Sequence, residues 1–89
     1  RFDLKLAGVS EEFASEWKSQ VDHAGRNETS LVMHYRSELV DIERLDADRD
    51  IWPQGVGGED PRDGSAEHGR DCMEKAVVLV ERLVEACGV

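Results

Sequence analysis

Basic residues are scarce in this chain. Its 89 residues include 11 Lys and Arg against 20 Asp and Glu, which leaves a formal net charge of −9. Nucleic-acid backbones and anionic membrane surfaces are bound by clustered positive charge. The composition therefore argues against both kinds of partner, and it is also compatible with a protein adapted to salt.

Long apolar runs are missing as well. No run approaches the ~18 residues expected of a transmembrane helix, and no basic-then-apolar leader is visible. The chain opens "RFDLKLAGVS", without a methionine, so we expect it to be processed, trimmed or part of something longer. Its length allows at most one small domain.

Cysteine is rare, and the two present, Cys72 and Cys87, lie fifteen residues apart in what reads as one helix. At the helical rise their Cα atoms would be about 22 Å apart, too far for a disulfide within that helix. Neither belongs to a metal-type CxxC spacing. We interpret them as small apolar residues of a cytoplasmic protein.

The first elements are short. Residues 2–9 begin with apolar–polar alternation, which predicts a short strand or an extended entry. Ser10 then resembles an N-cap, and two glutamates follow in the first turn. Phe13 and Trp17 are four residues apart, so they share one face of a predicted helix over residues 11–19.

Two further helices are predicted, separated by a long connection. The run "TSLVMHYRSELV" predicts a helix that Thr29 or Ser30 would cap. Residues 41–64 carry both prolines and no sustained period, which indicates a loop with turns and room for one short strand. Ser65 opens the clearest helix, whose apolar residues recur at i, i+3, i+4 spacing, and Gly88 ends it.

These helices have apolar faces, yet the chain barely supplies a sheet for them to cover. This pattern fits the last part of an α/β domain better than a whole one. We therefore expect residues 1–89 to be a segment of a larger α/β domain.

Asp22, His23 and Glu28 gather at the entry to the second predicted helix. Histidine suits proton transfer near neutral pH, and a carboxylate at the first turn of the helix could fold back to hold one ring nitrogen and fix the tautomer. The alternative is that Asp22 is a solvated loop charge, His23 a surface residue and Glu28 a carboxylate that favours the helix dipole.

Four other residues are candidates for a functional site. His34 fits a solvated or partly packed helix position better than a ligand position, and His68, beside Glu67, fits a cap or a solvent-facing position. An adjacent Glu67/His68 pair without a third ligand is poor evidence for a metal. Trp52 is a loop anchor or the wall of a pocket. Arg62 is expected to hold a turn or a subunit contact.

Two blocks of the sequence resemble the creatininase family of metal-dependent amidohydrolases. The first is "HAGRNETSLVMHYRSELVD" and the second is "GVGGEDPRDGSAEHGRD". The first block keeps the family's histidine, two small residues and Glu-Thr-Ser, and the second keeps its Asp-Pro-Arg. The matching residues are His23, Ala24, Gly25, Glu28, Thr29, Ser30, Glu38, Leu39, Val40, Gly55, Val56, Asp60, Pro61, Arg62, Ala66, Glu67, Gly69 and Arg70.

The resemblance implies an α/β/α sandwich on a mostly parallel sheet, of which this chain would be the C-terminal portion. It also implies two divalent metal ions, zinc, manganese or iron, that activate water. The family's Glu-x-His and His-x-Glu ligand motifs are absent here, so the metals would be held by residues outside this chain. His23 corresponds to the family's proton-shuttling histidine, and Glu28 would be its partner.

The resemblance also has departures. Ser37 replaces the proline that the family places before Glu-Leu-Val, and Ser19-Gln20 stand where creatinine-specific members have a Trp-Asp pair. Creatinine itself is therefore in doubt.

The resulting hypothesis is a metal-dependent hydrolase that cleaves a C–N bond of a cyclic amide or formamide, with His23 and Glu28 as catalytic residues. Its expected partners are a small-molecule amide, the remaining N-terminal portion of the enzyme and further copies in a homo-oligomer, with no nucleic acid and no membrane. The alternative hypothesis is a non-catalytic fragment or assembly module that lacks the metal-binding half.

Overall fold

The computed structural model describes residues 10–88. They form three α-helices, α1 (Glu11–Gln20), α2 (Arg26–Arg36) and α3 (Ala66–Ala86), and three short 3₁₀ helices, η1 (Ser37–Leu39), η2 (Ile42–Arg44) and η3 (Pro61–Asp63). The strand predicted within residues 2–9 lies outside the described range.

The predicted α/β/α sandwich with a mostly parallel sheet is wrong for the described part of the chain, which is helical and contains no strand. The only extended pairing there is an isolated antiparallel bridge between His23 and Gly57. The short strand allowed for in residues 41–64 is absent too, because glycines and prolines break that segment into turns.

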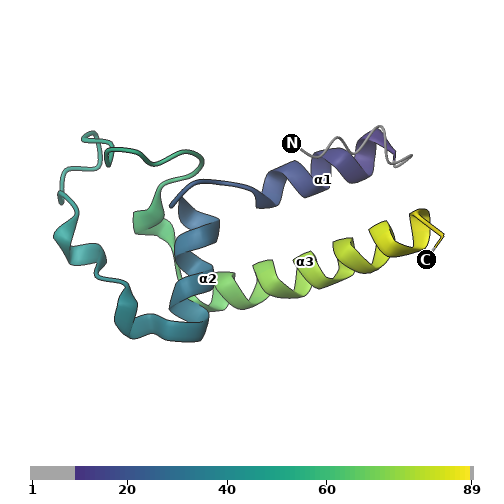
Figure 1. The fold of residues 1–89 in the computed structure, drawn as a ribbon. Helices are drawn as coiled ribbons and strands as arrows, with labels where there is room; N and C mark the ends of the chain where they lie inside the picture. The colour runs from purple at the N-terminus through teal and green to yellow at the C-terminus, as the bar shows by residue number, and fades with distance from the viewer. Residues whose placement is uncertain (1–9, 89) are drawn as a thin grey trace.

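Helix α3 organises the molecule (Figure 1). Its first half packs against α2, and α1 runs beside its second half. The connection from η1 to η3 lies beyond α2, at the opposite end of the molecule from the C-terminus. The result is elongated, with principal extents of 47 × 24 × 18 Å.

The predicted starts of α1 and α3 and the predicted end of α3 are confirmed. The side chain of Ser10 accepts from the Phe13 N–H at 3.1 Å, and that of Ser65 accepts from the His68 N–H at 3.0 Å. Gly88 follows α3 with φ +72°, the left-handed conformation expected after a helix C-terminus.

Helix α2 begins earlier than predicted. Its N-cap is Gly25, which has no side chain to offer, and neither Thr29 nor Ser30 caps it. The capping function comes instead from Asp22, three residues before the N-cap. Sequence periodicity missed this because residues 26–28 are polar and do not extend the apolar stripe.

The core is small and lies between α1 and the second half of α3. Phe13, Ala14 and Leu79 are buried there, with Trp17 and Leu83 packed against them. Phe13 and Trp17 stack with ring centroids 6.3 Å apart, so the shared face predicted for them is confirmed. The outer faces of α2 and α3 still expose apolar side chains, among them Val32, Tyr35, Val77, Val78, Val80 and Val84.

No helix within the described residues is long and apolar enough to cross a membrane.

Candidate functional site

The segment that joins α1 to α2 is pinned to the loop before η3. The His23 N–H donates to the Gly57 carbonyl at 2.9 Å, and the Gly57 N–H donates to the His23 carbonyl at 2.9 Å. The Arg26 N–H also donates to the Glu59 carbonyl at 3.0 Å. The two sequence blocks that carry the family resemblance therefore lie side by side. They are joined by backbone hydrogen bonds, which a pattern of side chains in the sequence does not predict.

Asp22 fixes the start of α2. One carboxylate oxygen accepts from the Asn27 N–H at 2.7 Å and the other accepts from the Glu28 N–H at 3.0 Å. The first N–H groups of a helix have no intrahelical acceptor, and the helix dipole favours negative charge at this end. Asp22 is thus a capping residue, and not the loop charge or member of a catalytic cluster that the sequence predicts.

Glu28 reaches back over the same turn. Its Oε2 accepts from the Ala24 N–H at 2.5 Å, and the hydroxyl of Thr29 donates to the Ala24 carbonyl at 3.2 Å. Ala24 itself has φ +52°, a left-handed conformation that costs a non-glycine residue free energy. The Glu-Thr pair of the Glu-Thr-Ser motif therefore holds a strained residue directly after His23.

The His23 side chain is exposed, although its backbone is locked by the bridge to Gly57. Its ring makes no hydrogen bond to any other described residue. The Glu28 carboxylate contacts the backbone of the neighbouring residue and does not contact the ring. The arrangement leaves both ring nitrogens of His23 available to a bound molecule.

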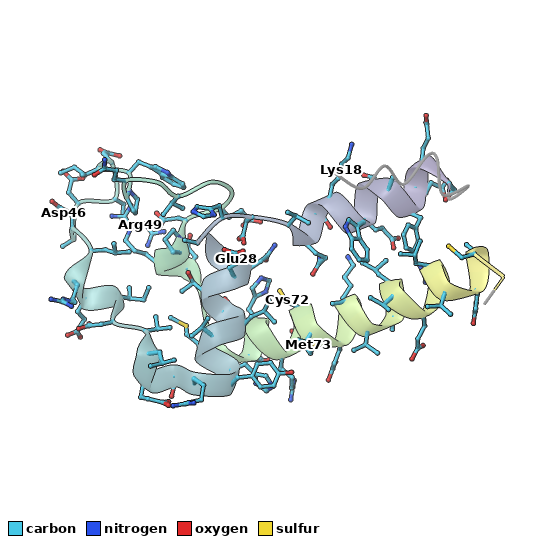
Figure 2. All side chains as sticks on the ribbon, viewed as in Figure 1. Lys18, Glu28, Asp46, Arg49, Cys72 and Met73 are labelled. Carbon is cyan, nitrogen blue, oxygen red and sulfur yellow. The ribbon has the colours of Figure 1, made fainter. Side chains whose placement is uncertain are left out.

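An open, mostly apolar cavity of about 430 Å³ adjoins this turn. Glu28 lies at the first turn of α2, on the side from which the chain enters (Figure 2). The polar part of the lining comes from Glu28, Thr29 and Asp41, and the apolar part comes from Ala24, Val32, Leu39, Val40, Ile42, Leu45, Val56 and Pro61. A small molecule with an apolar body would fit such a cavity next to His23.

A second polar cluster joins α2 to α3, and the sequence did not predict it. The His68 Nε2 lies 2.8 Å from the Asn27 Oδ1, and the Cys72 Sγ lies 3.4 Å from the same Nε2 and 3.5 Å from Asn27 Oδ1. His68 therefore neither caps a helix with its ring nor simply faces solvent. The i, i+4 spacing of His68 and Cys72 was the available signal, but nothing in the sequence places Asn27 against it.

This cluster does not have the geometry of a cysteine nucleophile. In such a site the cysteine and the orienting amide contact different nitrogens of the imidazole, whereas here both lie against Nε2. Burial is the main cause that raises the pKa of the Cys72 thiol, and the negative charge of Asp22 raises it further. A buried thiol with a raised pKa is a poor nucleophile.

The contacts of the three remaining candidates, His34, Trp52 and Arg62, indicate structural roles. The ring of His34 lies edge-on to Tyr35 on the exposed end of α2. The Trp52 Nε1–H donates to the Val56 carbonyl at 2.9 Å, so Trp52 anchors its own loop. The Arg62 guanidinium binds Asp60 and four backbone carbonyls, which confirms that Arg62 holds a turn.

Comparison with known protein families matches residues 2–87 to the family described as creatininase, creatinine amidohydrolase. The chain belongs to the creatininase family. No curated protein and no solved structure matches it.

Membership implies kinship with metal-dependent amidohydrolases. The described residues of this creatininase-family chain do not fit a two-metal centre, because no three His, Cys, Asp or Glu side chains among them converge on one point. Carboxylate and imidazole ligands are what a hydrolytic two-metal site requires. We therefore assign no metal ligand of that centre to residues 10–88.

Replacing Asp22 with alanine in this creatininase-family chain is expected to lower the free energy of unfolding by about 1–2 kcal/mol, the usual cost of losing an N-cap side chain. Two N–H groups of α2 would lose their acceptors. Urea unfolding followed by circular dichroism measures the change. Asp22→Asn keeps one acceptor oxygen and should lose roughly half as much, while equal stability of all three proteins would contradict the capping role.

Proposed function

We propose that this chain takes part in hydrolysis of the C–N bond of a cyclic amide or formamide, and that His23 is the residue that moves the proton. The observation that carries the proposal is the exposed His23 ring, whose backbone is fixed by the bridge to Gly57 and whose neighbour Ala24 lines an open cavity. Family membership supports the reaction class. A reacting amide in the cavity would lie against Ala24, the residue that follows His23.

The chemistry assigned to His23 is a two-way proton transfer. The neutral ring accepts a proton as water adds to the carbonyl carbon, and it returns that proton to the nitrogen as the C–N bond breaks. An imidazole suits both directions because its ordinary pKa lies close to neutrality. The divalent metals of the family supply activated water when bound, and their ligands would come from the remaining N-terminal portion of the enzyme.

Glu28 is a positioning residue in this proposal. Its carboxylate binds the Ala24 N–H and so stabilises the strained conformation of the residue next to His23. The direction of the His23 side chain depends on that backbone. Removal of Glu28 should therefore weaken turnover less than removal of His23, because the ring remains.

The test is His23→Ala in the complete enzyme, assayed for release of amine from cyclic amides and from formamides. Loss of the general acid–base group should lower kcat by about 10²- to 10⁴-fold, with bound metal unchanged by elemental analysis. His34→Ala is the matched control, since His34 is an exposed histidine on α2, does not line the cavity and should keep full activity. Loss of metal together with activity in His23→Ala would make His23 a ligand or a structural residue and would end the proposal.

A second candidate function is a non-catalytic assembly module. It is favoured by the exposed valines on the second half of α3 and by the absence, among residues 10–88, of any cluster of three His, Cys, Asp or Glu side chains that could belong to the two-metal centre. A denaturing intact-mass spectrum of the purified protein separates the two. A longer second polypeptide beside the 10.0 kDa chain favours the enzyme, and a single 10.0 kDa species favours the module.

A further inference from the structure

Three side-chain atoms from two helices converge between α2 and α3. They are the Asn27 Oδ1, the His68 Nε2 and the Cys72 Sγ, and their separations are 2.8, 3.4 and 3.5 Å. Figure 2 shows Cys72 on the first half of α3, where α2 crosses it. Each of the three atoms can present a lone pair to a common point.

The three residues are held in place in different ways, through a side-chain contact, a backbone contact and burial. The Asn27 Nδ2 donates to the Ser19 carbonyl at 3.0 Å, so the amide is oriented with Oδ1 toward α3. The His68 N–H is bound by the Ser65 hydroxyl at the N-cap of α3. Cys72 lies one helical turn after His68 and is only 6% exposed. The site is therefore assembled by the fold and does not depend on long mobile side chains.

We propose that Asn27, His68 and Cys72 form a binding site for one thiophilic metal ion such as Zn²⁺. From Zn–S and Zn–N bonds of about 2.3 and 2.0–2.1 Å, two ligands of a tetrahedral ion lie about 3.3–3.6 Å apart. The two separations that involve Cys72 already fall in this range. The Asn27–His68 separation must open by about half an ångström, which replaces their hydrogen bond with two bonds to the ion.

The donor set and the charge decide the kind of ion. A thiolate with an imidazole selects Zn²⁺, Cd²⁺ or Cu⁺ over Mg²⁺ or Ca²⁺, which prefer oxygen ligands. Binding releases the Cys72 thiol proton to solvent, while the His68 proton moves to Nδ1 and frees Nε2. The net charge of −9 favours any cation. The fourth position of the ion is left for water or another ligand.

The experiment is a titration of the reduced full chain with Cd²⁺, followed by the ultraviolet charge-transfer absorption that appears only when a thiolate binds the ion. One equivalent is expected to bind, and Zn²⁺ is expected to displace it. Cys72→Ser should abolish the band, and His68→Ala should weaken binding at least tenfold. Cys87→Ser is the matched control because it removes the chain's only other cysteine, which is exposed, and it should leave the titration unchanged.

A band that survives in Cys72→Ser, or one that His68→Ala does not weaken, would overturn the site. If a variant unfolds, the wild-type protein still decides the question through the ring ¹⁵N signals of its histidines. His68 must shift at one equivalent of Zn²⁺ while His34 does not, and the absence of a selective His68 shift would also overturn the proposal. The titration is independent of amide hydrolysis, so its outcome neither supports nor removes the role given to His23.

Discussion

Replacing Gly69 with alanine is expected to destabilise the protein by about 3 kcal/mol, the upper end of the usual cost of overpacking. A β-carbon at this position would lie 1.9 Å from the Ser30 carbonyl oxygen and 2.4 Å from the Ser30 carbonyl carbon. Both atoms belong to the backbone of α2, so no side-chain rotation can relieve the overlap. The two helices would have to separate, and the hydrogen bond from the Ser65 N–H to the buried Ser30 hydroxyl would be lost with them.

The expected loss of stability in Gly69→Ala is opposite in sign to the usual effect of this substitution in a helix. In an ordinary helix, Gly→Ala stabilises by up to about 1 kcal/mol through helix propensity. Gly57→Ala is the matched control, because a β-carbon there would meet only the His23 Cβ at 3.9 Å, an ordinary contact. Urea unfolding should show a large loss for Gly69→Ala and a change within about 0.5 kcal/mol for Gly57→Ala. A stabilised Gly69→Ala protein would contradict the close crossing of α2 and α3.

Local signals in the sequence were sufficient for α1 and α3. Ser10 caps α1 as predicted, and α3 begins after Ser65 as predicted. These features depend on residues within a turn or two of one another. The side chain of α3 that is buried in the core is Leu79, which lies outside the predicted apolar stripe, whereas Val77, Val80 and Val84 of that stripe are exposed. The predicted sheet is wrong because it did not rest on local signals. The prediction assumed that the apolar faces of the helices need a sheet to cover them, but residues 10–88 form no sheet and leave those faces exposed.

The candidate site was only partly predictable. The motif placed His23 and Glu28 near one another, but the carboxylate binds the backbone of Ala24 and leaves the imidazole free. A sequence shows which side chains are close along the chain, yet it does not show which N–H lacks an acceptor. The contact between Asn27 and His68 spans 41 residues and depends on the helix crossing that Gly69 permits.

Replacing Arg62 with leucine is expected to release the loop of residues 46–51. The Arg62 side chain is only 7% exposed, and all N–H groups of its guanidinium have acceptors. The Nε donates to the Asp60 carboxylate, and the two terminal nitrogens donate to the carbonyls of residues 46, 48, 49 and 51. Arginine presents five donors in a fixed fork. Leucine would fill part of the volume but would leave the four carbonyls without their partner.

Amide hydrogen exchange measures the release. The Ile51 N–H, which donates to the Asp48 carbonyl at 3.0 Å, should exchange at least tenfold faster in Arg62→Leu. Arg62→Lys keeps the positive charge but has only three donors, so its exchange rate at Ile51 should lie between those of the wild-type protein and Arg62→Leu. Arg70→Ala is the control, because Arg70 is exposed on α3, away from this loop, and its ion pairs with Asp71 and Glu74 lie at the surface, where such pairs contribute little. Unchanged exchange at Ile51 in Arg62→Leu would show that the loop is ordered by other contacts.

The same contact makes the loop sensitive to acid. The hydrogen bonds from Arg62 hold the pKa of the Asp60 carboxyl below its usual range, and Asp60 in turn raises the pKa of Arg62. A carboxyl whose pKa is lowered by folding adds stability that is fully present above its unfolded pKa of about 4 and is lost as the pH falls through the folded value. Exchange at Ile51, corrected for the intrinsic rate, should therefore stay constant from pH 7 to 5 and accelerate below about pH 4. In Arg62→Leu that acid-induced step should shrink, because the protonation of Asp60 then breaks only its longer ion pair with Arg49 at 3.6 Å.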